Sequence, residues 1–298
     1  MSRILVAGCN GQLGRDCQCA LAAHELRPLD VPDIDITSPE SVAARFAEFR
    51  PDVVVNCAAY TAVDKAESDE TRCRAVNAEG PRILAEACRA AGAYLVHVST
   101  DYVFDGLREP PRPWRETDST GPATVYGRTK LDGERAVAAT GCRHAILRTA
   151  WLYGAHGKNF PKTMLRLALA NPTKPLRVVA DQYGCPTWSD RLARQIQKLI
   201  DQPAPPTGLF HAVALGHTTW YGFASEFLRL MDVPYTILPC TTAEYPTPAK
   251  RPANSILEDA ALAHLGLCVM DDWHAALAAY VAAHRDALLA EAQAALRA

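Results

Sequence analysis

Short apolar runs alternate with longer amphipathic stretches through the first half of this 298-residue chain. The apolar runs are typical of buried strands and lie at residues 3–8, 26–30, 52–58, 94–100 and 144–151. The stretches between them predict helices at residues 12–23, 39–49 (after the cap residue Ser38), 71–91 and 125–139. Repeated β-α alternation requires parallel strands joined by right-handed crossovers. We therefore predict an α/β fold built on a doubly wound parallel sheet of the Rossmann type.

The second half of the chain differs because proline-rich connections such as "DQPAPPTG" punctuate it. This change predicts a first domain over residues 1–150 and a smaller lobe over residues 151–298. Strand-like residues 176–180 and 208–213 are candidates to join the first sheet, so we expect the two parts to interleave. A last helix is expected over residues 271–297. The residues predicted to form its packing face are Trp273, Leu277, Tyr280, Val281, Ala287 and Leu288.

Composition narrows the range of partners. With 31 basic and 33 acidic residues the net charge is −2, so no basic field for nucleic acid or anionic lipid is expected, and a small molecule becomes the favoured partner. No apolar run reaches the length of a membrane span and the N-terminus lacks a signal-peptide pattern, which predicts a cytoplasmic protein.

The ten cysteines form no C-x-x-C pair and are interpreted as buried apolar side chains, with a nucleophilic Cys142 the weaker alternative. No metal-ligand spacing is present, and no catalytic metal is predicted.

The stretch "VAGCNGQLG" places three glycines between the first strand and the first helix. Glycines at such a junction permit a tight turn and close backbone approach, while the helix start directs its amides at a pyrophosphate. A plain turn is the alternative, but the strand-loop-helix context favours dinucleotide binding. The residues expected to contact the cofactor here are Gly8, Asn10, Gly11, Gln12, Leu13 and Gly14.

Asp30 ends the second predicted strand, where an acidic side chain can accept hydrogen bonds from an adenosine ribose. A carboxylate there repels a 2′-phosphate, so NADH is favoured over NADPH, with NADPH left open because Arg27 lies nearby. The alternative for Asp30 is an ordinary turn residue. Asp35 and Ile36 are predicted near the adenine, with Asp35 alternatively capping the next helix.

Tyr126 and Lys130 lie four residues apart, so a helix places them on one face. A cation beside a phenol lowers the phenol pKa from about 10, which would let Tyr126 protonate a carbonyl oxygen as hydride reaches its carbon. Lys130 is also placed to hold the nicotinamide ribose. Thr100, at the end of the fourth strand, offers a hydroxyl to the same oxygen; Ser99 is its rival, because adjacent strand residues point to opposite faces. The alternative is an unremarkable surface Tyr-Lys pair.

The motifs "GCNGQLG", "NCAAYTAVDKAE", "STDYVFDG", "YGRTK" and "RTAWLYG" together resemble the extended short-chain dehydrogenase/reductases, and among them the dTDP-4-dehydrorhamnose reductase family. Later segments such as "NFPKTML", "VVADQYGCPT" and "RPANSIL" agree, so the resemblance spans nearly the whole chain. It implies an enzyme that uses NADH or NADPH to reduce the 4-keto group of dTDP-4-dehydro-L-rhamnose in nucleotide-sugar and cell-surface polysaccharide biosynthesis.

The resemblance also implies residue roles. It makes Thr100, Tyr126 and Lys130 the catalytic set and assigns the cofactor-contacting segment to Ala58, Ala59 and Tyr60. The residues it places at the substrate are Thr61, Val63, Thr100, Asp101, Tyr102, Trp151, Arg251 and Asn254. Asp101 is expected to accept backbone hydrogen bonds, without a catalytic role. An Arg forks well onto a diphosphate, although an ordinary surface charge is the alternative for Arg251.

Other functions remain open at this point. Tyr102 follows Asp101 where the related 4,6-dehydratases carry a Glu, so elimination lacks its base. A reductase or an epimerase of another NDP-4-keto sugar is one alternative. A regulatory subunit of the methionine adenosyltransferase type, which shares this fold, is another. The resemblance leaves the homodimer, the choice between NADH and NADPH, and any Mg²⁺ requirement undecided.

Overall fold

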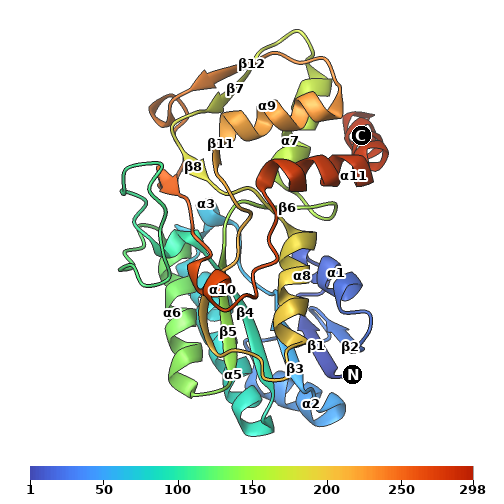
Figure 1. Ribbon diagram of the computed structural model, residues 1–298, viewed down its shortest axis with the longest axis vertical. Helices are drawn as coiled ribbons and strands as arrows, with labels where there is room; N and C mark the ends of the chain where they lie inside the picture. Colours follow the sequence, from blue (N-terminus) through green and yellow to red (C-terminus); the bar gives the residue numbers. More distant parts are fainter. Residues whose placement is uncertain (298) are drawn as a thin grey trace.

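The computed structural model describes residues 1–297 and contains a six-stranded parallel sheet in the order β10-β5-β4-β3-β1-β2 (Figure 1). The strands are β1 (Arg3–Ala7), β2 (Glu25–Leu29), β3 (Val53–Asn56), β4 (Tyr94–Thr100), β5 (His144–Thr149) and β10 (Gly208–His211). The chain passes from β2 on one side of β1 to β3 on the other. In doubly wound sheets, ligands bind at the carboxyl ends of the strands where the order reverses in this way.

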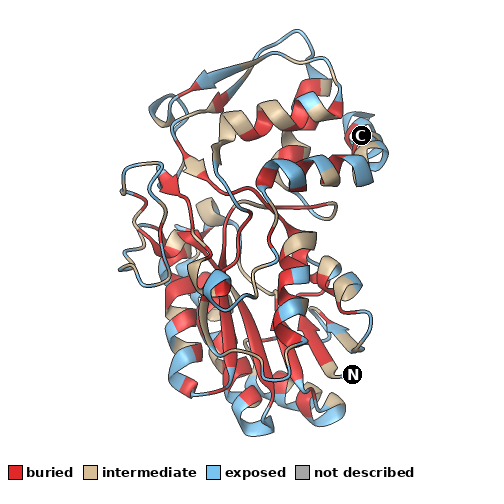
Figure 2. Ribbon diagram, viewed as in Figure 1, coloured by how far each residue is buried: buried red, intermediate tan, exposed pale blue. Residues whose placement is uncertain are grey.

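Helices cover both faces of this sheet. They are α1 (Gln12–Ala20), α2 (Pro39–Phe49), α5 (Gly80–Ala91), α6 (Val125–Thr140) and α8 (Ser189–Ile200), with the short α3 (Val63–Ala66), α4 (Glu70–Arg74) and α10 (Ala260–His264), the π-helical turn η1 (Ala75–Glu79) and the 3₁₀ turn η2 (Asp101–Val103). Side chains alternate along β1, so Ile4 and Val6 pack toward α1 and α8, while Leu5 and Ala7 pack toward α2 and α5. Figure 2 shows the resulting buried central strands.

The second lobe lies above the carboxyl ends of the strands in Figure 1. Its helices are α7 (Phe160–Ala170), α9 (Trp220–Met231) and α11 (Trp273–Arg297), and its other elements are β6 (Leu152–Tyr153), β7 (Leu176–Val179), β8 (Tyr183–Gly184), β9 (Thr187–Trp188), β11 (Thr218–Thr219), β12 (Ile237–Cys240), the 3₁₀ turn η3 (Thr242–Glu244) and β13 (Asn254–Ser255). Aromatic side chains dominate its core, with Tyr153, Phe223, Phe227 and Tyr280 completely buried.

The five strands predicted in the first half are confirmed, β4 with the bounds expected. The predicted helix over residues 71–91 is interrupted by the π turn η1, and the helix from Gln12 ends three residues earlier than expected, at Ala20. Ser38 caps α2 as predicted, because its Oγ accepts a hydrogen bond from the Ser41 amide at 3.1 Å. These differences leave the predicted α/β class intact.

The two strand-like segments of the second half behave differently. β10 extends the main sheet beside β5, whereas β7 pairs only with β12 in a separate two-stranded sheet. Ala287 is exposed, so its expected place on the packing face of α11 is wrong. Seven of the ten cysteines are buried, which agrees with their interpretation as apolar side chains. Within residues 1–297, no helix has the length and apolar character needed to cross a bilayer.

Candidate active site

The glycine loop joins β1 to α1 at the edge where the sheet order reverses. Gly8 adopts a φ of +76°, and a Cβ there would lie 2.6 Å from the Ala58 amide nitrogen. A Cβ on Gly14 would lie 2.2 Å from the Gly8 carbonyl oxygen. Gly11 caps α1 without a side-chain acceptor, so the amides of its first turn are available to an anion. The loop therefore fits the pyrophosphate of a dinucleotide.

Asp30 ties the end of β2 to this loop. Its two carboxylate oxygens accept hydrogen bonds from the amides of Asn10 at 3.0 Å and Val31 at 2.9 Å. Each oxygen keeps a lone pair that a ribose hydroxyl could use. Arg27 is paired with Glu48, so it offers a 2′-phosphate no free charge.

Three other predicted cofactor residues have structural partners. Leu13 is buried in the core beneath the loop. Ile36 is also buried, and its side chain occupies the space that a Cβ on Gly80 would need. Asp35 accepts hydrogen bonds from the amide and hydroxyl of Thr37, which hold the pKa of its carboxyl below the usual range. Asp35 thus shapes the turn before α2, while Ser38 provides the cap.

The segment from Ala58 to Tyr60 crosses the carboxyl end of β3 beside Gly8. Asn77, in the π turn η1, holds it by accepting from the Tyr60 amide at 2.8 Å and donating to the Tyr60 carbonyl at 3.1 Å. Asn56 accepts from the Ala58 amide at 3.1 Å. Sequence reasoning missed Asn77, and the only signal for it is a polar residue inside an otherwise helical pattern. A π turn inside a helix often marks a functional site.

Thr100, Tyr126 and Lys130 come together from two elements. Thr100 ends β4, and Tyr126 and Lys130 lie one turn apart near the start of α6, which Thr124 caps by accepting from the Gly127 amide at 3.0 Å. Lys130 donates from Nζ to the Val98 carbonyl of β4 at 2.6 Å. Ser99 faces Glu134 instead of the cleft, which leaves Thr100 as the hydroxyl beside Tyr126.

Burial is the main influence on the pKa values of Tyr126 and Lys130. It raises the pKa of the Tyr126 phenol, with the nearby Thr100 side chain opposing the rise. The expectation that this pKa lies below about 10 is wrong, because burial has the largest effect on the Tyr126 phenol. Burial also lowers the pKa of Lys130 to about 8, against the opposing charge of Glu134. A phenol that keeps its proton at neutral pH suits a proton donor.

A cavity of about 940 Å³ opens next to this set, between the sheet body and the second lobe. Tyr102 lines it and packs edge-to-face against the Tyr126 ring, with centroids 5.5 Å apart. Arg251 lines it from the second lobe and donates from Nη2 to Asp64 at 2.7 Å, while its buried Nη1 has no partner. Val63 directly precedes Asp64 at the start of α3. A planar cation with an unused edge in such a cavity suits a phosphate group.

Trp151 is held in an unusual conformation next to the cavity. Its φ is +47°, and its ring stacks on Trp220 of α9 with centroids 3.5 Å apart and planes 7° apart. Phe160 packs against Trp220, and both line the cavity. A Cβ on Gly184 would lie 2.3 Å from the Trp151 ring, so only glycine leaves room for it. An aromatic wall of this kind suits the apolar face of a sugar ring.

Two predicted substrate residues serve the protein interior instead. Asn254 is 1% exposed and donates to the carbonyls of Arg108 and Arg112 while accepting from the Ile256 amide. The expected place of Asn254 at the substrate is therefore wrong. Its side chain instead anchors the loop that runs from Arg108 to Arg112. Asp101 is also buried, and it accepts from the Thr100 hydroxyl at 2.9 Å. Burial raises the pKa of Asp101 to about 6.

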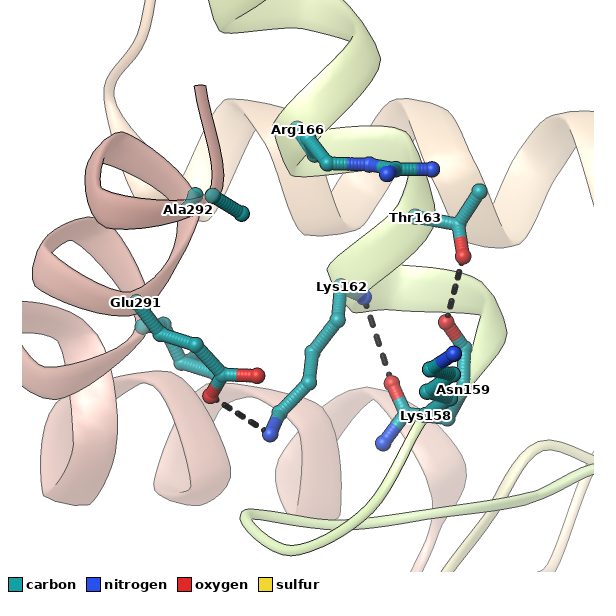
Figure 3. Close-up of a pocket in the computed structure, with 9 residues that line it drawn as sticks. Lys158, Asn159, Lys162, Thr163, Arg166, Glu291 and Ala292 are labelled. Carbon is teal, nitrogen blue, oxygen red and sulfur yellow. Dashed lines mark hydrogen bonds and ion pairs between the residues drawn. The ribbon is translucent and has the colours of Figure 1, made fainter. Parts of the chain in front are cut away.

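A second hollow, of about 200 Å³, lies between α7 and α11 (Figure 3). Lys162 points across it to Glu291, with Nζ and Oε2 2.7 Å apart, so its charge is neutralised (Figure 3). Asn159 caps α7 and donates from Nδ2 to Gln12 Oε1 at 2.8 Å. Gln12 thereby links the glycine loop to the second lobe, a contact that sequence reasoning missed.

Comparison with known proteins identifies the family of this chain. The family model described as "RmlD substrate binding domain" matches residues 1–285. The chain belongs to this RmlD family. Within the described residues, no group of three His, Cys, Asp or Glu side chains could hold a metal ion.

Relatives of this RmlD-family chain match over nearly their whole length. A dTDP-4-dehydrorhamnose reductase of Burkholderia thailandensis is 41% identical, over 92% of this chain and 96% of its own. A protein of Streptomyces antibioticus named "Probable dTDP-4,6-dihydroxy-2-methyloxan-3-one 4-ketoreductase" is 44% identical, over 92% and 93%. A crystal structure of the dTDP-4-dehydrorhamnose reductase of Bacillus anthracis in complex with NADP has 36% identity and a TM-score of 0.89, covering 94% of this chain and 98% of that one.

Proposed function

We propose that this protein is an NAD(P)H-dependent oxidoreductase that reduces the 4-keto group of dTDP-4-dehydro-L-rhamnose to give dTDP-L-rhamnose. The observation that carries the proposal is the meeting of Thr100, Tyr126 and Lys130 beside a cavity large enough for a sugar nucleotide. The names of the curated relatives support the reaction and the substrate class.

The residues have distinct parts in this reaction. NADH or NADPH, when bound, would supply the hydride for C4 of the sugar. Tyr126 donates its phenolic proton to the ketone oxygen, and the Thr100 hydroxyl, turned from Asp101 toward the substrate, would donate a hydrogen bond to the same oxygen. Lys130 stabilises the phenolate that remains, because its ammonium lies on the same helix face. Gly8, Gly11 and Gly14 with the start of α1 would hold the pyrophosphate, and Asp30 the adenosine ribose.

The substrate is proposed to lie across the cavity. Arg251 would bind the diphosphate through its free guanidinium edge, while the Trp151–Trp220 stack flanks the sugar. Tyr102 lines the same cavity and packs against the edge of the Tyr126 ring. The sugar is thereby held with its ketone toward the sheet edge that carries Thr100.

A second candidate is a 4-ketoreductase of another dTDP-4-keto sugar. The relative in Streptomyces antibioticus, whose printed name specifies a different dTDP-sugar ketone, supports it. Both candidates use the same chemistry at C4, so the sugar substituents near the aromatic wall would distinguish them. Parallel assays with the two ketones give the ratio of their kcat/KM values, and the larger value identifies the substrate.

The test follows absorbance of the reduced nicotinamide with purified protein, dTDP-4-dehydro-L-rhamnose, and NADH or NADPH in parallel. We expect stoichiometric consumption with at least one cofactor. Tyr126→Phe should lower kcat by about 10²- to 10⁴-fold, because it removes the proton donor, while cofactor affinity stays unchanged. An epimerase would give product without net consumption, and a regulatory subunit would bind the cofactor without turnover; either result refutes the proposal.

A further inference from the structure

A buried carboxylate lies one helical turn beyond Lys130, outside the substrate cavity. Glu134 of α6 accepts hydrogen bonds from Ser99 Oγ at 2.5 Å, Arg148 Nε at 2.9 Å and Arg148 Nη2 at 2.7 Å. The side chains of Glu134 and Arg148 are only 6% and 3% exposed. The proposed chemistry uses neither residue, although both are ionisable groups in the interior.

The contacts of Glu134 with Ser99 and Arg148 connect α6, which carries Tyr126 and Lys130, to β4, which ends at Thr100. Ser99 lies beside Arg148 in the register of β4 and β5, and it directly precedes Thr100. Glu134 therefore fixes α6 to both strands at the level of Thr100. Lys130 is bound to the same strand through the Val98 carbonyl. The distance between the helix with Tyr126 and the strand with Thr100 depends on this connection.

The charge of Lys130 depends on few neighbours. Glu134 faces it from α6, Cys73 from α4, Cys57 from the end of β3 and His97 from β4. Burial raises the pKa of the Cys73 thiol, so it stays neutral at pH 7. Burial and Lys130 lower the pKa of His97, so it too is neutral. Of these groups Glu134, which is paired with Arg148, is the one with a charge that opposes the loss of the lysine proton.

We propose that Glu134 is a positioning residue that keeps Lys130 in its ammonium form and holds α6 against β4, with Arg148 orienting its carboxylate. The inference rests on the proposed reduction, in which charged Lys130 stabilises the Tyr126 phenolate. A buried ion pair with a structural role alone would affect unfolding but not the titration of Lys130. Direct measurement of that titration therefore separates the two roles.

Two variants separate charge from shape. Glu134→Gln removes the charge and keeps the shape, and Gln can still accept from Ser99. Arg148→Lys keeps the charge and breaks the two-pronged contact, because an ammonium cannot match a carboxylate with two parallel donors. The readout is the NMR titration of ¹³Cε-labelled lysine in the ligand-free full chain, where Lys130→Met identifies the Lys130 signal. This readout needs neither cofactor nor turnover.

We expect a wild-type midpoint near pH 8, which Glu134→Gln should lower by about one pH unit through loss of an adjacent opposite charge. In turnover assays the same shift should lower kcat about fivefold at pH 8 and hardly at all at pH 6, with the KM for NADPH unchanged. Arg148→Lys should lower the unfolding temperature and leave the midpoint in place.

An unchanged midpoint in Glu134→Gln, or equal shifts in both variants, would overturn the proposal. If Glu134→Gln does not fold, Glu134→Asp keeps the charge and should keep the midpoint close to the wild-type value, so a fall of about one pH unit in that variant counts against a role of the charge. If wild-type protein reduces no sugar nucleotide, the proposed function fails while the NMR midpoints still decide the link between Glu134 and Lys130.

Discussion

Substitution of Gly14 by alanine tests whether the glycine loop is shaped for a cofactor. The new Cβ would lie 2.2 Å from the Gly8 carbonyl oxygen and 2.7 Å from Cys9 Cα, both backbone atoms. Reaching the ordinary contact distance of about 3.4 Å requires a displacement of about 1.2 Å between α1 and the loop. That movement turns the first amides of α1 away from the pyrophosphate.

The expected magnitudes follow from this displacement. Overpacking costs about 1–3 kcal/mol, and the better helix propensity of alanine returns about 1 kcal/mol. Gly14→Ala should therefore destabilise the fold by about 2 kcal/mol at most. A displacement of about 1 Å in a binding site costs on the order of 10²-fold, so we expect affinity for NADH and NADPH to fall about 10- to 100-fold.

The assay is a fluorescence titration of the protein with each cofactor in the absence of substrate, together with thermal unfolding. Gly121→Ala is the matched control, because a Cβ there would lie 3.5 Å from Asp105 Cβ, which is ordinary contact, and its backbone is not left-handed. The control should bind both cofactors as the wild type does. Unchanged affinity in Gly14→Ala, with the fold intact, would refute the assignment of the loop to the pyrophosphate.

Two further predictions concern the aromatic wall and acid stability. Trp220→Ala removes the ring that stacks on Trp151. Because such an aromatic pair contributes about 0.5–1.5 kcal/mol, KM for the sugar nucleotide should rise about 2- to 10-fold. A parallel loss of affinity for NADPH in a binding titration would contradict this role. Burial lowers the pKa of His211 to about 3, so the unfolded chain takes up a proton below pH 6.5 that the folded chain does not. The free energy of unfolding should therefore decline as the pH falls from about 6.5 toward 3. In urea unfolding at pH 4, 5 and 6, His211→Gln should reduce the dependence of this free energy on pH by up to about 1.4 kcal/mol per pH unit. An unchanged pH dependence would exclude His211 as its source.

The sequence was sufficient for the elements that carry the site. A short apolar run predicted β4 with its observed ends, and helical spacing placed Tyr126 and Lys130 on one face of α6. These features depend on neighbours close in the chain, where periodicity is informative. The glycine spacing likewise predicted a loop that the structure closes around Gly8.

Features that depend on contacts between residues far apart in the chain could not be predicted from sequence periodicity. Asn254 was expected at the substrate, but its amide binds carbonyls more than 140 positions earlier in the chain. The pKa of Tyr126 moves in the opposite direction to that expected, because burial has the largest effect on the phenol. Asn77 gave no periodic signal at all, since its role depends on a turn that only the folded chain forms.

β10 is the last strand of the main sheet in chain order, and this order affects folding during synthesis. More than fifty residues separate β5 from β10, and α8, which packs on α1, lies within that interval. A nascent chain that has emerged only as far as β5 presents an unpaired strand edge and an uncovered apolar helix face. Synthesis must reach His211 before the sheet is complete, so a fragment cut at residue 150 should aggregate.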